Sequence, residues 1–317
     1  MDLLQRVSLG RSSLQVPRLG LGTVAIGGLF GTVTEEEAHA LIRRSYELGL
    51  RLFDTAPIYG FGLAESRLGQ VLPDLPRSEY VVSTKVGRLL RPMSAAAKTA
   101  HILREAVSLK GEGIKLVTEK VRRVAQRLTK GTASGVRLGY PFDQGTGSLV
   151  EVWDFSYDGA MRSLESSLKR LKLDRVDIVM IHDPDHHYAE ALNGAYRALE
   201  RLRREGVVSA IGVGMRQSAM MARFAGDADF DCFLLAGRYT LLDQSALADL
   251  LPLCLEKQIS IVIGGVFNSG ILVDPKPGVS FDYKPATQER LARALRLRAV
   301  CERYDVPLPA AAMQFPL

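Results

Sequence analysis

The stretch RLFDTAPIYG, residues 51 to 60, decides the fold. Its first residues alternate as a β-strand does, and a turn containing Pro57 and Gly60 then ends the strand. Asp54 and Tyr59 lie at this junction of strand and loop, Lys85 closes a second apolar strand, YVVSTK, and His182 closes a third, DIVMIHD. Polar residues at strand ends are typical of the catalytic edge of a (β/α)8 barrel, so we expect these four side chains to meet there.

These residue types in this pattern indicate proton transfer. A phenol has a pKa of about 10, so a tyrosine acid/base needs a neighbouring cation that favours the phenolate. Lys85 can be that cation, and Asp54 can be the partner that a buried ammonium requires. A neutral His182 can hydrogen-bond a carbonyl or alcohol oxygen beside the phenol. Each residue alone also has a structural explanation, such as a turn at Asp54, but their shared position at strand ends favours catalysis.

Outward from these strands, the sequence alternates between strand and helix signals. Thr34 and Glu37 form a capping box for a helix that stops at Gly49, and a second helix is predicted over 158–171. With 317 residues and 47% hydrophobic content, the chain suits one α/β TIM-type barrel domain over 1–317. Seven strands are predicted, at 19–23, 51–54, 80–84, 176–181, 208–213, 231–236 and 259–264, with a hairpin at 5–18 under the barrel floor.

Several of these stretches resemble the aldo-keto reductase family, and within it the branch of D-threo-aldose (L-fucose) dehydrogenases and pyridoxal 4-dehydrogenases. The resemblance implies hydride transfer between a substrate carbon and a nicotinamide, NAD or NADP. It also implies Tyr59 as acid/base, Lys85 and Asp54 as its tuning pair, and His182 as the residue that orients the substrate. The family's eighth strand and last helix would follow AAMQFPL (311–317), so they are expected to be missing. The stretches are LGLGT (19–23), FDTAPIYGFGLAESRLG (53–69), VSTKVGR (82–88), VWDFSYDG (152–159), DRVDIVMIHDPD (174–185), IGVGM (211–215), LLAGRYTLLDQSAL (234–247) and GGVFNSGIL (264–272).

The cofactor site is predicted from the same resemblance. No GxGxxG follows a strand, so a Rossmann pyrophosphate loop is not indicated. The loop GGVFNSGIL could hold a diphosphate on its backbone N–H groups. The resemblance implies that Tyr239 stacks on the nicotinamide and that Met215 and Arg216 lie where relatives contact its carboxamide, although the branch tends to have Asn in place of Arg216. The phosphate contacts would come from Phe267, Asn268, Ser269, Gly270 and Leu272.

The implied reaction is oxidation of an aldose hemiacetal or a pyridoxal-like substrate to a lactone, or the reverse carbonyl reduction. The partner is then a small carbonyl, alcohol or sugar. The alternative is a non-catalytic or regulatory barrel that binds a partner through a basic insertion at 92–148, after the third strand. The net charge of +6 is concentrated there, because ten lysines and arginines between Lys98 and Arg137 face only three glutamates. Amphipathic helices on the barrel surface are expected, and the absence of stacking aromatics between Lys98 and Lys130 argues against RNA.

The residues at and after the end of the DIVMIHD strand could instead form a metal site. Imidazole and carboxylate groups are common ligands, and they gather at His182, Asp183, Asp185, His186 and His187. The other strand ends add no ligand, so no metal is predicted. The three cysteines lack CxxC spacing and are expected to be reduced. The N-terminus has no apolar leader, and no run approaches a membrane span, so we expect a cytoplasmic protein without a membrane partner; the sequence does not indicate the oligomeric state.

Overall fold

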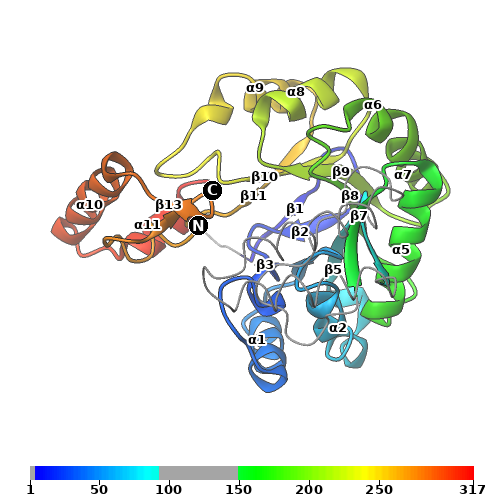
Figure 1. Cartoon of the computed structure of the whole chain (residues 1–317), viewed down its shortest axis with the longest axis horizontal. Helices are drawn as coiled ribbons and strands as arrows, with labels where there is room; N and C mark the ends of the chain where they lie inside the picture. Colours follow the sequence, from blue (N-terminus) through cyan, green and yellow to red (C-terminus); the bar gives the residue numbers. More distant parts are fainter. Residues whose placement is uncertain (1–3, 93–148) are drawn as a thin grey trace, which may run out of the picture.

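The central element is a parallel sheet of seven strands that curves into a nearly closed barrel (Figure 1). The computed structural model describes residues 4–92 and 149–317. All six pairings within this sheet are parallel, and its strands lie in chain order. The predicted TIM-type barrel with seven recognisable strands is confirmed. The strands are β3 (Leu21–Gly22), β4 (Leu52–Asp54), β5 (Val81–Val86), β8 (Ile178–His182), β9 (Ala210–Met215), β10 (Cys232–Ala236) and β11 (Ser260–Gly264).

The middle strands are apolar runs because both of their faces are covered. Every residue of β5, β8 and β9 is buried, as is typical of parallel strands between a barrel interior and its helices. Each residue of β11 is only partly buried. All seven predicted strand ranges overlap an observed strand, and their ends differ from it by at most two residues.

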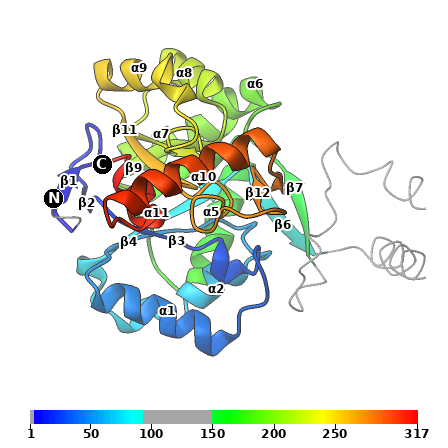
Figure 2. The same cartoon turned by 90° about the vertical axis from the view of Figure 1, so that its left-hand side faces the viewer.

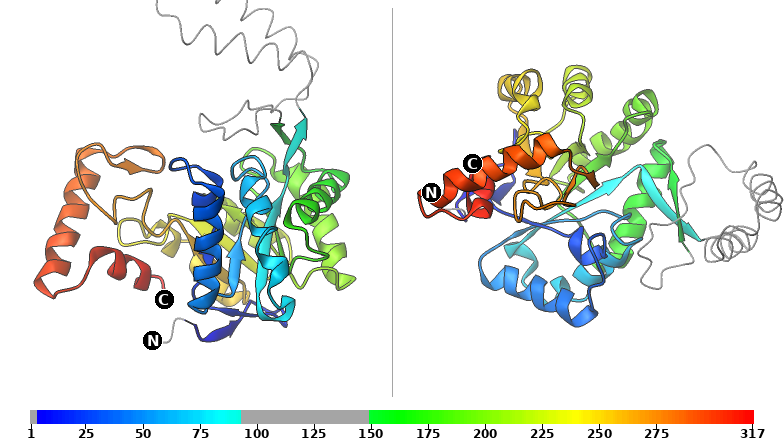
Figure 3. Two further views of the ribbon diagram at one scale, coloured as in Figure 1. Left: turned by 90° about the horizontal axis from the view of Figure 1, so that it is seen from below. Right: turned by 60° about the vertical axis from the view of Figure 1, so that its left-hand side comes forward.

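Helices surround the sheet (Figure 3). The capping box of α1 is present as predicted, since the Thr34 hydroxyl accepts from the Glu37 N–H and the Glu37 carboxylate accepts from the Thr34 N–H. The predicted helix 158–171 is α5 and starts one residue earlier. The longer helices here are α1 (Glu35–Glu47), α2 (Leu63–Leu68), α5 (Tyr157–Leu171), α7 (Tyr196–Arg204), α8 (Ser218–Asp227) and α9 (Leu250–Glu256). Short turns are η1 (Ala25–Gly27), η2 (Leu72–Asp74), η3 (Arg77–Glu79), α6 (Tyr188–Glu190), the π-helical η4 (Ala191–Ala195) and η5 (Ser245–Leu247).

The predicted hairpin at 5–18 consists of β1 (Arg6–Ser8) and β2 (Gln15–Pro17). Leu9 and Val16 are buried against barrel residues such as Ile178, so the hairpin packs on one end of the barrel. Its turn approaches the barrel backbone closely: Gly10 has φ +56°, and a Cβ there would lie 2.0 Å from the Asp231 carbonyl oxygen. Only glycine allows this approach without a shift of the backbone.

A second hairpin interrupts the chain between β5 and β8 and was not predicted. It pairs β6 (Arg88–Pro92) with β7 (Leu149–Trp153) in antiparallel register, and it projects from the barrel (Figure 2). These strands flank the segment for which the sequence predicts a basic helical insertion. Apart from Pro92, the predicted insertion 92–148 lies outside the described residues.

The C-terminal region, residues 265–317, has its own small core. It contains β12 (Ser280–Phe281), β13 (Lys284–Pro285), α10 (Gln288–Arg303) and α11 (Leu308–Gln314). In Figure 2, α10 and α11 lie between α8 and α9 on one side and α1 and α2 on the other. None of the helices in residues 4–92 and 149–317 has the length and apolar character needed to cross a membrane. The small core comprises Leu242, Ile271, Leu272, Phe281, Ala294, Leu308 and Ala312.

Candidate active site

Lys85 and Asp54 form the charged base of the site. The ammonium of Lys85, at the end of β5, donates to both carboxylate oxygens of Asp54, at 2.8 and 3.0 Å, and to the Thr55 carbonyl at 2.8 Å. Ser83 adds a hydrogen bond of 2.7 Å to Asp54. Burial alone would lower the pKa of Lys85, but Asp54 and Tyr59 outweigh it and raise the pKa, so the lysine stays charged. The structure therefore brings together the predicted cation and its partner.

Tyr59 lies above this pair, in the turn after β4. The Lys85 ammonium is 4.9 Å from the centre of the phenol ring. Burial raises the pKa of Tyr59 to about 12; Lys85 opposes this rise, and Asp54 and Asp183 add to it. The sequence argument expected Lys85 to favour the phenolate. That lowering is present, but burial is the larger effect, and the phenol is protonated at neutral pH.

His182 completes the predicted group from the end of β8. Its ring lies edge-on to the Tyr59 ring, with 5.9 Å between centroids. Burial, followed by the positive charges of Arg88 and Lys85, holds the pKa of His182 well below its usual range. The imidazole is therefore neutral, as predicted. Its Nδ1 is buried and has no hydrogen-bond partner in the described part of the chain.

Arg88 is the functional candidate that sequence reasoning missed. This residue of β6 is buried and ion-pairs with Glu151 of β7 and with Asp183, the residue after His182. Trp153 also donates to Glu151, at 2.8 Å. Burial raises the pKa of Asp183, and Arg88 opposes that rise. Arg88 stands in the VSTKVGR stretch, but its partner Glu151 follows 63 positions later in a hairpin that the pattern did not indicate.

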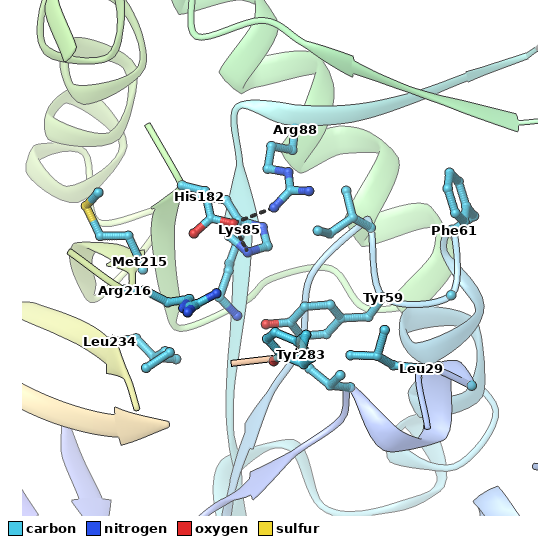
Figure 4. Close-up of a pocket in the computed structure, with 18 residues that line it drawn as sticks. Leu29, Tyr59, Phe61, Lys85, Arg88, His182, Met215, Arg216, Leu234 and Tyr283 are labelled. Atoms are coloured by element: carbon cyan, nitrogen blue, oxygen red, sulfur yellow. Dashed lines mark hydrogen bonds and ion pairs between the residues drawn. The ribbon is translucent and has the colours of Figure 1, made fainter. Parts of the chain in front are cut away.

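These residues border a cavity of about 300 Å³ at the carboxyl ends of the strands. Figure 4 shows the phenol of Tyr59 pointing into the space bordered by Lys85, His182 and Arg216. Tyr283, which also lines the cavity, stacks its ring on that of Phe30, with 6.4 Å between centroids and 15° between planes. Polar groups thus cover the side near His182, while the remaining wall is mainly apolar. The apolar lining includes Val24, Leu29, Ile58, Phe61, Met215, Leu234 and Ala236.

Part of the cavity lining is apolar, as a flat nicotinamide ring would require. These lining residues are Gly214, Met215, Leu234 and Ala236, at the ends of β9 and β10. A Cβ at Gly214 would lie 3.3 Å from Cε of Lys85, so its absence keeps this surface open next to the lysine. An aromatic ring placed here would lie beside the proton-transfer group. A volume of about 300 Å³ is at the lower end of ligand pockets.

Among the predicted cofactor residues, Met215 and Arg216 line the cavity and Tyr239 does not. Arg216 ion-pairs with Asp282 at 2.6 Å, next to Tyr283. The Tyr239 ring contacts Phe315, just after α11, with 5.1 Å between centroids. Stacking of Tyr239 on a nicotinamide therefore stays a prediction, and it requires a face of this ring that Phe315 leaves open.

The predicted phosphate loop 267–272 is bonded to the segment after β10 and to its own region. The Asn268 side chain donates to the Gly237 carbonyl at 3.2 Å and accepts from Thr240 at 2.7 Å. The Ser269 hydroxyl accepts from the Tyr283 N–H, and Leu272 is buried in the small core. The N–H groups of Asn268, Gly270 and Leu272 donate within the loop, to Gly265 or Phe267. A diphosphate would have to use other groups of the loop, so these contacts remain predictions.

The histidines and carboxylates after β8 have separate partners. His187 packs against Trp153 and Phe155 and pairs with Glu190 at 2.8 Å. Asp185 accepts a hydrogen bond from Gln217. The structure thus joins His182 and Asp183 to the Tyr59 cavity and directs His187 to the hairpin and to α6.

Comparisons with known proteins show the family and the fold of this chain. The model of the Aldo/keto reductase family matches residues 18–118 and 148–317. The chain is 40% identical to D-threo-aldose 1-dehydrogenase of Pseudomonas sp, over 96% of this chain and 83% of that protein. It is 38% identical to pyridoxal 4-dehydrogenase of Microbacterium luteolum, over 99% and 85%. An aldo-keto reductase of Bacillus halodurans, solved in a holo form, shares the fold with a TM-score of 0.63 at 22% identity, over 98% of this chain and 81% of that one.

Proposed function

The chain belongs to the aldo/keto reductase family, and from that premise we propose that it oxidises the hemiacetal carbon of a small aldose, or a pyridoxal-like substrate, to a lactone. The same site would catalyse the reverse carbonyl reduction. The family and its dehydrogenase relatives make the chain a nicotinamide-dependent oxidoreductase. The observation that carries the proposal is the convergence of Tyr59, Lys85 and His182 on one cavity.

The proposed roles follow from the contacts of each side chain. A bound nicotinamide would supply the acceptor for the hydride that leaves the substrate carbon. Tyr59 takes the proton of the substrate hydroxyl as the carbon–oxygen double bond forms, and it returns that proton in the reverse reaction. Lys85, held by Asp54, stabilises the phenolate between these steps. Neutral His182 donates a hydrogen bond to the substrate oxygen and so fixes its position.

The protonation state of Tyr59 favours one direction. With a pKa of about 12 the phenol starts as a proton donor, which is the form that carbonyl reduction requires. Oxidation requires the phenolate, and the positive charge of Lys85 is the feature that makes this form accessible. We therefore propose that the catalyst works in both directions and that rising pH accelerates oxidation.

The cofactor assignment combines the structure with the family resemblance. Met215, Arg216 and Tyr239 would hold the nicotinamide end. The loop formed by Phe267, Asn268, Ser269, Gly270 and Leu272 would hold the phosphates. NAD and NADP are both candidates. We also propose a cytoplasmic location, supported by three cysteines that are all unpaired.

The test is a steady-state assay of the purified full chain with L-fucose, pyridoxal and a small aryl aldehyde, each with NAD and NADP in the matching redox state. We expect turnover of at least one sugar or pyridoxal substrate with one cofactor. Titration of each cofactor by protein fluorescence measures binding separately. Binding without turnover of any substrate would refute the substrate class and favour a regulatory barrel. Absence of binding would refute the assignment of a nicotinamide enzyme to this chain.

A further inference from the structure

Asp183 occupies a backbone position that aims its side chain into the cavity. It follows His182 at the end of β8 and has φ +46°, in the left-handed region that Asp, Asn and Gly tolerate best. Its N–H donates to the Gly214 carbonyl at 2.9 Å, which joins it to the end of β9. The backbone of Asp183 is thus fixed on the same strand end as the histidine that faces Tyr59.

Arg88 occupies one oxygen of Asp183 and leaves the other available. Oδ2 accepts from the buried Arg88 guanidinium and lies 3.7 Å from Nε2 of His182. Within the described residues, Oδ1 has no hydrogen-bond partner, and the side chain is 34% exposed. A carboxylate held in this way is oriented and charge-compensated, yet it keeps an acceptor facing solvent.

The other residues that line the cavity offer no second carboxylate acceptor in the described part of the chain. Among the described residues that line it, Asp183 is the one carboxylate, because Asp54 lies below Lys85 and outside the lining. Val24, Leu29 and Phe61 present apolar surfaces. A substrate hydroxyl that enters this space finds a strong acceptor at Asp183 and little competition from the apolar wall.

We propose that Asp183, clamped by Arg88, selects hydroxylated substrates by accepting a hydrogen bond from a hydroxyl group on a carbon adjacent to the reacting carbon. This inference rests on the proposed function and deepens it, because it assigns the substrate class to polyhydroxylated aldoses. Oδ2, the oxygen that Arg88 holds, lies 3.7 Å from Nε2 of His182, and Oδ1 belongs to the same carboxylate. Two neighbouring oxygens of one sugar can therefore meet the imidazole and Oδ1. A carbonyl compound without such a hydroxyl lacks this contact.

The test compares Asp183→Asn with wild type on an aldose and on a small aryl aldehyde. Asn tolerates the same backbone but no longer offers a charged acceptor. We expect kcat/KM for the aldose to fall by about 10- to 100-fold, mainly through KM, and kcat/KM for the aryl aldehyde to stay within about threefold. Asp185→Asn, two residues further on in the same loop, is the matched control and should change neither value. Asp183→Gly, which keeps the backbone conformation, replaces Asp183→Asn if that variant does not fold.

Monodeoxy analogues of the aldose give the decisive readout. The wild type should discriminate against at least one analogue by about tenfold or more, and Asp183→Asn should treat that analogue and the parent sugar alike. If the variant keeps the full discrimination while both proteins turn over the substrates, Asp183 is not the selector and the proposed function stands. If the wild type turns over neither sugar nor aldehyde, the proposed function fails and this inference fails with it.

Discussion

The strands β5, β8 and β9 are buried along their whole length, whereas every residue of β11 is partly exposed. The two sides of the barrel also hold their polar residues differently. Lys85 is fixed by two carboxylate oxygens and a carbonyl beneath the surface, while Arg216 and Arg238 share Asp282 at the cavity rim. The buried side therefore fixes Lys85 and Asp54 rigidly, whereas the C-terminal region meets the cavity with contacts that are easier to change.

The largest expected effect is a loss of kcat on substitution of Tyr59, on the buried side of the barrel. Tyr59→Phe should lower kcat by roughly 10² to 10⁴, because the general acid/base is lost, with little change in the free energy of unfolding. Steady-state kinetics and urea unfolding measure the two quantities. The control is Tyr188→Phe, a phenol that donates to Asp227 outside the cavity and whose loss should leave kcat unchanged. Wild-type turnover by Tyr59→Phe would remove the phenol from the mechanism.

The stability of the main core and of the small core can be compared with the same leucine-to-alanine substitution in each. Leu68 in the main core and Leu272 in the small core are both fully buried. Leu68→Ala should cost about 3 to 5 kcal/mol of unfolding free energy, and Leu272→Ala about 2 kcal/mol, because the smaller core can collapse more completely around the cavity. Guanidinium unfolding monitored by circular dichroism gives both values. Equal losses would show that the small core is packed as tightly as the main one.

A pH effect is expected from His182. Its folded pKa lies well below the value of about 6.5 for an unfolded chain, so the unfolded state binds a proton more readily in this range. The contribution of His182 to stability is therefore complete above about pH 6.5 and is lost as the pH falls, at up to about 1.4 kcal/mol per pH unit. Urea unfolding between about pH 7 and 5 should show a shallower slope for His182→Gln than for wild type. Parallel slopes would mean that His182 titrates normally.

The smallest effect compares two helix caps. Thr34 caps α1 with a complete capping box, and Thr287 caps α10 through a single bond of 3.3 Å to the Arg290 N–H. Thr34→Ala should cost about 1 kcal/mol and Thr287→Ala about half as much. Thermal unfolding of the two variants makes the comparison. A larger loss at Thr287 would show that α10 contributes more to global stability than its half-exposed packing indicates.

The positions of the candidate catalytic residues could be predicted because local signals determine them. A polar residue at the end of a parallel strand lies at the carboxyl edge of the sheet. Asp54, Lys85 and His182 were therefore correctly expected at that edge. Arg88 could not be found in this way, since its role depends on the pairing of β6 with β7 across a separation that no short motif encodes. The pKa of Tyr59 was expected to respond mainly to Lys85. Burial instead has the largest effect on this pKa, and the burial of Tyr59 depends on how the whole barrel packs.

The cofactor residues show where resemblance stops being sufficient. Tyr239 and Leu272 were assigned by position in a family pattern, but Tyr239 contacts Phe315 and Leu272 is buried in the small core. Such contacts join the loops after β10 and β11 to helices far along the chain. The sequence pattern of a βα repeat does not indicate which helix will cover which loop.

The stacked rings of Phe30 and Tyr283 have a consequence for how the protein moves. Phe30 follows β3 and Tyr283 follows β11, and these are the edge strands of the sheet. Both rings are largely exposed, so the contact between them is weak and can open without unfolding of either side. We expect a fluctuation that separates the two edges to part these rings and to widen the cavity beside Tyr283, which lines it. Substrate entry is then expected to follow this breathing of the sheet, and a dependence of kcat/KM on solvent viscosity would measure it.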